Sequence, residues 1–109
     1  MAAGWYESRG YQVLDRNWSC PSGELDIVAY RALVYVFCEV KARSSATFGY
    51  PAEAVGYLKQ ARVRRLAATW LAAPRGSVPL RGVNRRGCQV RFDVASVMAG
   101  AVDVIEGAF

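Results

Sequence analysis

The sequence of 109 residues contains no histidine and has only three cysteines, Cys20, Cys38 and Cys88. The cysteines show no Cys-x-x-Cys spacing, which argues against a zinc site built from the usual cysteine and histidine ligands. The lack of histidine also excludes a histidine general base and a serine–histidine nucleophile. An odd set of unpaired thiols is typical of a reducing compartment, so we expect a cytoplasmic protein.

Long apolar runs are missing as well. No stretch approaches the roughly 20 residues that a membrane-spanning helix needs, so we expect no membrane partner. The N-terminus lacks a basic segment followed by an apolar stretch, so no secretory signal is visible. A length of 109 residues and a hydrophobic content of 53% predict one folded domain over residues 1–109.

Lysine is scarce, although the chain is basic. The net charge is +5, and all of the 14 basic residues except Lys41 and Lys59 are arginine. This charge favours an anionic partner, and nucleic acid is the leading candidate. The alternative is that the arginines reflect codon usage in a GC-rich genome, so the charge by itself is weak evidence.

The segment from Gly23 to Arg43 predicts two strands, because it is rich in β-branched and aromatic residues. Alternation along a strand places Glu24, Asp26 and Val28 on one face of the first strand. In the second strand the corresponding face carries Phe37, Glu39, Lys41 and Arg43. The opposite faces are apolar, with Leu25, Ile27, Val36, Cys38 and Val40.

The short connection between these strands predicts an antiparallel hairpin. A two-residue loop would pair Tyr30 with Leu33, and a four-residue loop would pair Tyr30 with Tyr35. Both registers gather the same charged side chains on one face, namely Glu24, Asp26, Glu39 and Lys41.

Carboxylates that face each other across a sheet repel, so we expect a cation to offset their charge. Mg²⁺ or Mn²⁺ is the natural candidate, because hard cations take carboxylate oxygens and retain several waters. Lys41 lies on the same face as Glu39 and is placed to hold an attacking water or to stabilise charge on a phosphate. The alternative is an exposed, salt-bridged sheet face in which Lys41 pairs with the acids.

The rest of the chain predicts a short helix over residues 2–9, a strand over 11–18 and a turn over 19–23. A main helix follows over 52–73, then a strand over 88–98 and a last short strand over 102–105. The apolar arc of the main helix contains Val55, Leu58, Val63, Leu66, Ala67 and Trp70. Lys59 falls inside this arc, so it either extends to the rim or reaches the carboxylate face of the sheet. Because the fourth strand follows a helix, we expect it to run parallel to an earlier strand.

Arginines on this helix and in the following loop are candidates for contact with nucleic-acid phosphates. The helix carries Arg62, Arg64 and Arg65, and the loop over 75–87 carries Arg85 and Arg86. A solvated helix face is the alternative for each single arginine. Asp93 in the fourth strand is expected to form a salt bridge with Arg91 or Arg43 rather than to contact a metal.

Several motifs together resemble a known family. The segments are Gly-Glu-Leu-Asp-Ile-Val-Ala from Gly23, Val-Phe-Cys-Glu-Val-Lys-Ala-Arg from Val36, Phe48-Gly49-Tyr50-Pro51, Glu53-Ala54-Val55, Lys59, Arg91-Phe92-Asp93-Val94 and Ala108-Phe109. In this order and at these separations they resemble the YraN-like family of small bacterial proteins. That family belongs to the PD-(D/E)XK nuclease superfamily and is akin to archaeal Holliday-junction resolvases.

The resemblance implies an α/β fold with a restriction-endonuclease-like core, a mixed sheet in α-β-β-β-α-β order and a short C-terminal strand. It implies a Mg²⁺-dependent endonuclease acting on DNA, with branched DNA as the substrate class and a homodimer as the usual assembly. Asp26, Glu39 and the Val40 carbonyl would hold the metal, Lys41 would orient the attacking hydroxide, and Glu24 would assist.

The resemblance also favours an inward-facing Lys59, which would position phosphates together with Arg43 and the arginines of the helix and loop. One feature departs from the family, because YraN-like proteins usually carry a Gly-Glu pair near the start of a longer first helix. That acid would lie upstream of Met1, so a non-catalytic module that binds nucleic acid and keeps the nuclease fold is the alternative. DNA is favoured over RNA as its partner.

Overall fold

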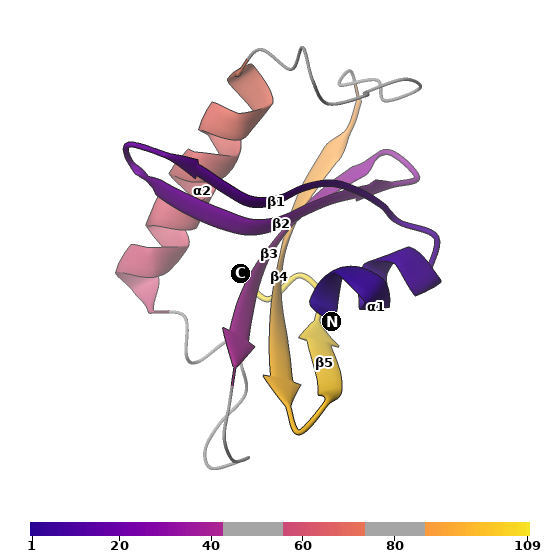
Figure 1. The fold of residues 1–109 in the computed structure, drawn as a ribbon. Helices are drawn as coiled ribbons and strands as arrows, with labels where there is room; N and C mark the ends of the chain where they lie inside the picture. The colour runs from indigo at the N-terminus through magenta and orange to yellow at the C-terminus, as the bar shows by residue number, and fades with distance from the viewer. Residues whose placement is uncertain (43–55, 74–86) are drawn as a thin grey trace.

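Five strands form one mixed sheet, and a helix packs on each of its faces (Figure 1). The computed structural model describes residues 1–42, 56–73 and 87–109. The elements are α1 (Ala2–Ser8), β1 (Gln12–Cys20), β2 (Gly23–Arg31), β3 (Val34–Ala42), α2 (Tyr57–Ala72), β4 (Gln89–Met98) and β5 (Ala101–Ile105). They follow one another in the predicted order, although several bounds differ. The chain is therefore a small α/β domain with five strands and two helices.

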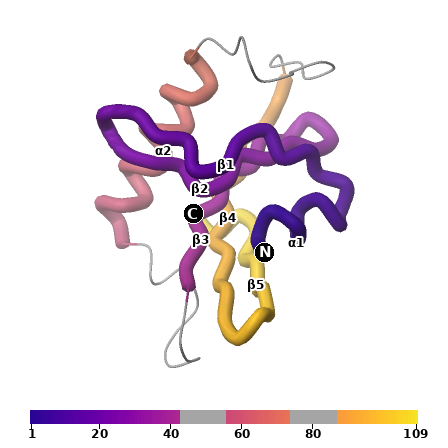
Figure 2. Tube along the Cα trace, in the orientation of Figure 1, coloured from indigo at the N-terminus to yellow at the C-terminus, as the bar shows by residue number. Residues whose placement is uncertain are grey.

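The strands lie in the order β1-β2-β3-β4-β5 across the sheet. β3 and β4 are parallel, as the helix between them predicts, and they run side by side in Figure 2. All other neighbouring pairs are antiparallel. This connection places α2 against the sheet beside the end of β3 that carries Glu39.

The β2–β3 hairpin adopts one of the two registers that the sequence allows. Tyr30 pairs with Tyr35, and the pairing continues to Ile27 and Cys38. Arg31 and Val34 also pair, so only Ala32 and Leu33 form the turn, with positive φ angles of 49° and 67°. Two-residue hairpin turns of this kind match the twist of the strands. The alternative pairing of Tyr30 with Leu33 is wrong.

The first hairpin also has a tighter turn than the sequence predicts. β1 extends to Cys20, which pairs with Gly23, so the predicted turn over 19–23 shortens to Pro21 and Ser22. The register shifts between Val13 and Asp15, which marks a β-bulge. The bulge breaks the simple alternation of β1, and Asp15 therefore faces α2, where it accepts a hydrogen bond from Trp70 Nε1 at 3.1 Å.

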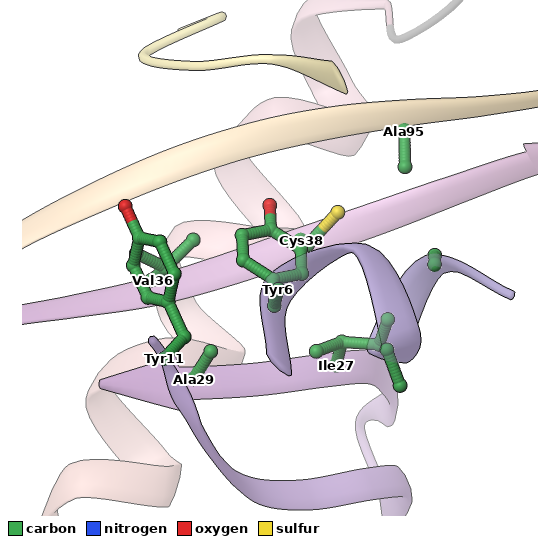
Figure 3. Packing of buried hydrophobic residues seen from close by; sticks show 9 residues of the cluster. Tyr6, Tyr11, Ile27, Ala29, Val36, Cys38 and Ala95 are labelled. Atoms are coloured by element: carbon green, nitrogen blue, oxygen red, sulfur yellow. The ribbon is translucent and has the colours of Figure 1, made fainter. Parts of the chain in front are cut away.

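Two apolar clusters hold the helices on the sheet. The cluster beneath α1 joins Tyr6 and Tyr11 to Ile27, Ala29, Val36, Cys38 and Ala95 (Figure 3). The cluster beneath α2 joins Val63, Leu66, Ala67 and Trp70 to Leu14, Leu25, Val28, Tyr35 and Phe37. Leu25 packs in the cluster beneath α2 and Ile27 in the cluster beneath α1, so the prediction that they share a face is wrong. The β1–β2 ribbon bends toward α2 at its tip, which turns Leu25 to that side (Figure 1).

The buried arc of α2 is confirmed in its middle and wrong at its start. Val63, Leu66, Ala67 and Trp70 are buried, but Leu58 is 81% exposed. The helix begins at Tyr57 after an extended Gly56, so Leu58 lies in its first turn. The predicted start over 52–55, with Val55, lies outside the described residues. No helix in the described part of the chain is long and apolar enough to cross a membrane.

Candidate functional site: an acidic pocket between the sheet and α2

The predicted acidic residues line one pocket of about 190 Å³ between β2, β3 and α2. Its lining consists of Glu24, Asp26 and Glu39 from the strands and Lys59, Arg62, Val63 and Leu66 from the helix. The strand register brings Asp26 and Glu39 together, because Ile27 pairs with Cys38 and the next residues are these two acids. We call this cavity the acidic pocket.

Glu39 is the most enclosed acid of the pocket, with 8% of its surface exposed. Lys59 Nζ lies 2.6 Å from its Oε1, and Lys41 Nζ lies 3.8 Å from the same oxygen. Lys59 therefore reaches the carboxylate face of the sheet, rather than only extending to the rim. The salt bridges that the sequence offered as an alternative are also present, and Lys59 provides the shorter one.

The two lysines affect each other's protonation. The hydrogen bond with Lys59, partial burial and the charge of Lys59 lower the pKa of Lys41. The hydrogen bond to Glu39 raises the pKa of Lys59. Lys41 is consequently the lysine that more readily becomes neutral, while Lys59 stays charged.

Asp26 stands between two cavities. Its Oδ2 accepts a hydrogen bond from the Val40 N–H at 2.8 Å, which fixes the carboxylate beside the end of β3. On the α1 side it lines a second cavity of about 280 Å³, together with Arg16, Asn17 and Val40. The Asp26 carboxylate is thus held in place by the backbone and bordered by open space on both sides of the sheet.

The predicted metal ligands are Asp26, Glu39 and the Val40 carbonyl. Within the described residues no group of three or more acids, histidines or cysteines is close enough to hold a metal. Two carboxylates and a carbonyl nevertheless fit Mg²⁺ or Mn²⁺, because such ions bind through one or two carboxylates and keep several waters. A cation that binds the Oε1 oxygen of Glu39 would have to replace Lys59 there, because Lys59 Nζ lies 2.6 Å from that oxygen.

The predicted arginines differ in their positions. Arg62 lines the acidic pocket, and Arg65 lines an adjoining cavity. The Arg64 guanidinium lies over the rings of Phe92 and Phe109, 5.6 and 5.3 Å from their centroids, and it lines neither cavity. Arg43, Arg85 and Arg86 lie outside the described residues. Sequence reasoning missed Ser22 and Thr69 of the adjoining cavity, although Thr69 follows Arg62 and Arg65 at helical spacing.

Asp93 takes no part in this pocket. It is fully buried on the α1 side of the sheet, where Arg91 donates two hydrogen bonds of 2.8 Å to it. The predicted salt bridge with Arg91 is confirmed. Cys20 and Cys38 are free thiols, and Cys38 packs in the cluster beneath α1.

Comparison with known proteins places this chain among many similar sequences. The profile of the uncharacterised protein family UPF0102 matches residues 1–97. A UPF0102 protein of Beutenbergia cavernae is 48% identical over 107 residues, covering 95% of this chain and 83% of the relative. A UPF0102 protein of Moorella thermoacetica is 45% identical over 114 residues, covering 99% and 88%. The chain therefore belongs to the uncharacterised protein family UPF0102, the YraN-like family that its motifs resemble.

Proposed function

We propose that this protein binds nucleic acid through the α2 side of its sheet and hydrolyses DNA phosphodiester bonds at the acidic pocket. One observation carries the proposal: a nearly buried Glu39 lies beside Asp26 and in contact with two lysines, in a cavity that opens next to Arg62. We further propose that the fold is the restriction-endonuclease-like core of the PD-(D/E)XK superfamily. The resolvase resemblance favours branched DNA as the substrate class.

The residues in and beside the pocket would have different roles in hydrolysis. Asp26, Glu39 and the Val40 carbonyl would hold Mg²⁺ or Mn²⁺, which when bound lowers the pKa of a coordinated water and neutralises phosphate charge. Lys41, with its lowered pKa, lies 3.8 Å from Glu39 Oε1 and would orient the attacking water from beside the pocket. Glu24 accepts a hydrogen bond from water at the pocket wall.

The charged side chains of α2 hold the substrate. Lys59 stays protonated through its contact with Glu39 and supplies positive charge where the phosphate oxygens gain negative charge. Arg62 contacts the same strand of nucleic acid from the helix, since its guanidinium presents several donors suited to phosphate.

A non-catalytic module that binds nucleic acid is the second candidate function. It is favoured by the ion pair between Glu39 and Lys59, which neutralises the acid without a metal. It is also favoured because, within the described residues, no three acids, histidines or cysteines are grouped closely enough to hold a metal ion. This module would retain the basic helix face but would not turn over substrate.

Thermal unfolding with and without millimolar Mg²⁺ or Mn²⁺ separates the two functions. A metal that binds only the folded state raises the unfolding midpoint by mass action. We expect a rise for the wild type, none for Asp26→Asn or Glu39→Gln, and a normal rise for Asp103→Asn, which changes charge equally at an exposed site on β5. Asparagine at 26 can still accept the hydrogen bond from Val40.

The same variants are then compared in cleavage of supercoiled plasmid and four-way junction DNA. The hydrolase proposal requires metal-dependent cleavage by the wild type and by Asp103→Asn, with loss in both pocket variants. Salt-sensitive DNA binding without any metal response or cleavage would reject hydrolysis and establish the binding module. Absence of DNA binding would reject both.

A further inference from the structure

A second, smaller cavity lies directly beside the acidic pocket. It has a volume of about 160 Å³ and is lined by Ser22, Arg62, Arg65, Leu66 and Thr69. Arg62 and Leu66 also line the acidic pocket, so the two cavities share a wall. We call this second cavity the arginine pocket.

Helical spacing brings three of the lining side chains together. Arg65 and Thr69 follow Arg62 by three and seven residues in α2, so all three lie along one stripe of the helix. Leu66 lies in the same stripe and is buried, which makes it the apolar floor of the cavity. The two arginines are exposed, and both border this one small volume.

A close approach of the β1–β2 turn closes the other side of the pocket. Gly23 has a φ of 147°, and a side chain there would place its Cβ 3.2 Å from Leu66 Cδ1 and 3.6 Å from Arg62 Cδ. Glycine is consequently required at this position, both for its backbone conformation and for the contact with α2. This contact brings the neighbouring Ser22 to the cavity wall.

The chemistry of the lining fits a phosphate group. Two guanidinium groups and the Ser22 hydroxyl are donors, and no acid from the described part of the chain lines the cavity. Among the described residues, no acid forms an ion pair with Arg62 or Arg65. The Thr69 hydroxyl donates to the Arg65 carbonyl at 3.0 Å, so Thr69 contributes a fixed wall rather than a donor. Converging arginines present several N–H groups in a geometry that matches phosphate oxygens.

We propose that the arginine pocket binds a backbone phosphate of the nucleic acid, next along the strand from the phosphodiester at the acidic pocket. The inference rests on the proposed binding of nucleic acid and adds the place of a second phosphate. Because Arg62 borders both cavities, it links the two phosphates. Arg65 touches only the arginine pocket and is the residue that reports on it alone.

The test is the salt dependence of duplex DNA binding, measured by fluorescence anisotropy with a labelled duplex. Each phosphate contact contributes about 0.9 to the slope of log affinity against log salt concentration. We expect Arg65→Gln to bind more weakly, with a slope less steep by up to about 0.9. The double variant Arg62→Gln/Arg65→Gln should bind more weakly still, with a further loss of slope, because Arg62 also borders the acidic pocket. Ser22→Ala should weaken binding without changing the slope, because its hydroxyl is neutral.

Arg9→Gln is the matched control, because it removes the same charge on the α1 side, where Arg9 stacks over Trp5. It should leave the affinity and the slope close to those of the wild type. The metal-dependent rise of the unfolding midpoint should persist in Arg65→Gln, which shows that the fold and the acidic pocket are intact.

Each other result overturns a specific claim. If Arg65→Gln binds DNA with the affinity and the salt dependence of the wild type, the arginine pocket is rejected and the proposed function stands. Stabilisation of the wild type by inorganic phosphate without any DNA binding would assign the pocket to a free anion and reject both proposals.

Discussion

Two buried carboxylates on opposite faces of the sheet differ in how completely they are paired. Asp93, with no exposed surface, accepts hydrogen bonds from Tyr6 Oη at 2.6 Å, twice from Arg91 at 2.8 Å, and from the Gly107 N–H at 3.0 Å. Glu39, with 8% exposed, has ion pairs to Lys59 and Lys41 in the described part of the chain. The first carboxylate is saturated with donors, and the second borders an open cavity.

The difference separates a structural role from a functional one. Asp93 connects α1 through Tyr6 and the segment after β5 through Gly107, so its network fastens both ends of the described chain to β4. A fully satisfied network leaves no capacity for a ligand. Glu39 keeps its pairing groups on long side chains, which are 26% and 34% exposed and can rearrange when an ion or a phosphate enters. Unequal saturation therefore supports the acidic pocket as the proposed site.

The largest predicted contrast is in stability. Asp93→Asn should lower the free energy of unfolding by about 3–5 kcal/mol, because it leaves Arg91 without its buried partner. Glu39→Gln should cost about 1 kcal/mol or less, since its lysines can turn toward solvent. Urea denaturation checks this through a shift of the midpoint at an unchanged slope. Equal losses in the two variants would contradict the difference in pairing.

A smaller loss is expected when one donor of the saturated network is removed. Tyr6→Phe keeps the buried ring but removes the hydroxyl that donates to Asp93, and it should cost about 1.5–3 kcal/mol. Burial raises the pKa of Tyr6, so this hydroxyl remains a donor throughout the pH range of the measurement. Tyr57→Phe is the control, because Tyr57 is 80% exposed and its change should stay within about 0.5 kcal/mol. If Tyr6→Phe loses no more unfolding free energy than Tyr57→Phe does, Asp93 does not depend on the Tyr6 hydroxyl as a donor.

The acidic pocket was easier to predict from sequence than the Asp93 network. Alternation along β2 and β3 and a short hairpin loop suffice to bring Asp26 and Glu39 together. The helical arc that contains Lys59 predicts its inward position, and the structure shows its contact with Glu39. These predictions rest on local periodicity, which the sequence displays directly.

Other features depend on contacts between distant residues. The bond from Tyr6 to Asp93 spans 87 positions, and no local pattern reveals it. The bulge that turns Asp15 toward Trp70 is equally invisible in the alternation of β1. The exposure of Leu58 is hidden in the same way, because Leu58 continues the apolar period of α2.

The pairing in the acidic pocket should also be visible in lysine titrations. With only two lysines in the chain, lysine-selective NMR yields two side-chain signals that single variants assign. Lys59→Gln removes the neighbouring group that lowers the pKa of Lys41, so the pKa of Lys41 should rise toward its ordinary value of 10.5. Glu39→Gln should lower the pKa of Lys59, because it removes the hydrogen bond that raises it. A Lys41 titration that does not move in Lys59→Gln would show that the two lysines are not coupled.

The same shifts have opposite effects on stability. The lowered pKa of Lys41 means that the unfolded chain binds more protons just below pH 10.5, so the contribution of Lys41 to stability rises with pH there. The raised pKa of Lys59 gives a contribution that is complete below pH 10.5 and is lost as the pH rises further. Lys41→Gln should therefore reduce the rise below pH 10.5, and Lys59→Gln should reduce the loss above it.

The closed character of the α1 side can be tested through its thiol. Burial and the nearby Asp93 charge outweigh a hydrogen bond from Tyr6 and raise the pKa of Cys38 to about 12. With that pKa, only about one Cys38 thiol in a thousand is ionised at pH 9, whereas a thiol with the ordinary pKa of 9.0 is half ionised. Iodoacetamide should therefore modify the half-buried Cys20 quickly, and Cys38 only when the α1 side opens.

Labelling then reports on opening of that side rather than on thiol chemistry alone. Asp93→Asn weakens the network around Cys38 and should speed its labelling through a larger open population. Glu39→Gln lies on the other side of the sheet and should leave the rate nearly unchanged. Labelling of wild-type Cys38 as fast as Cys20 would mean that the α1 side is open in the native state. In that case the complete hydrogen bonding of Asp93 would not mean that the α1 side is closed, and the contrast with the open acidic pocket would fail.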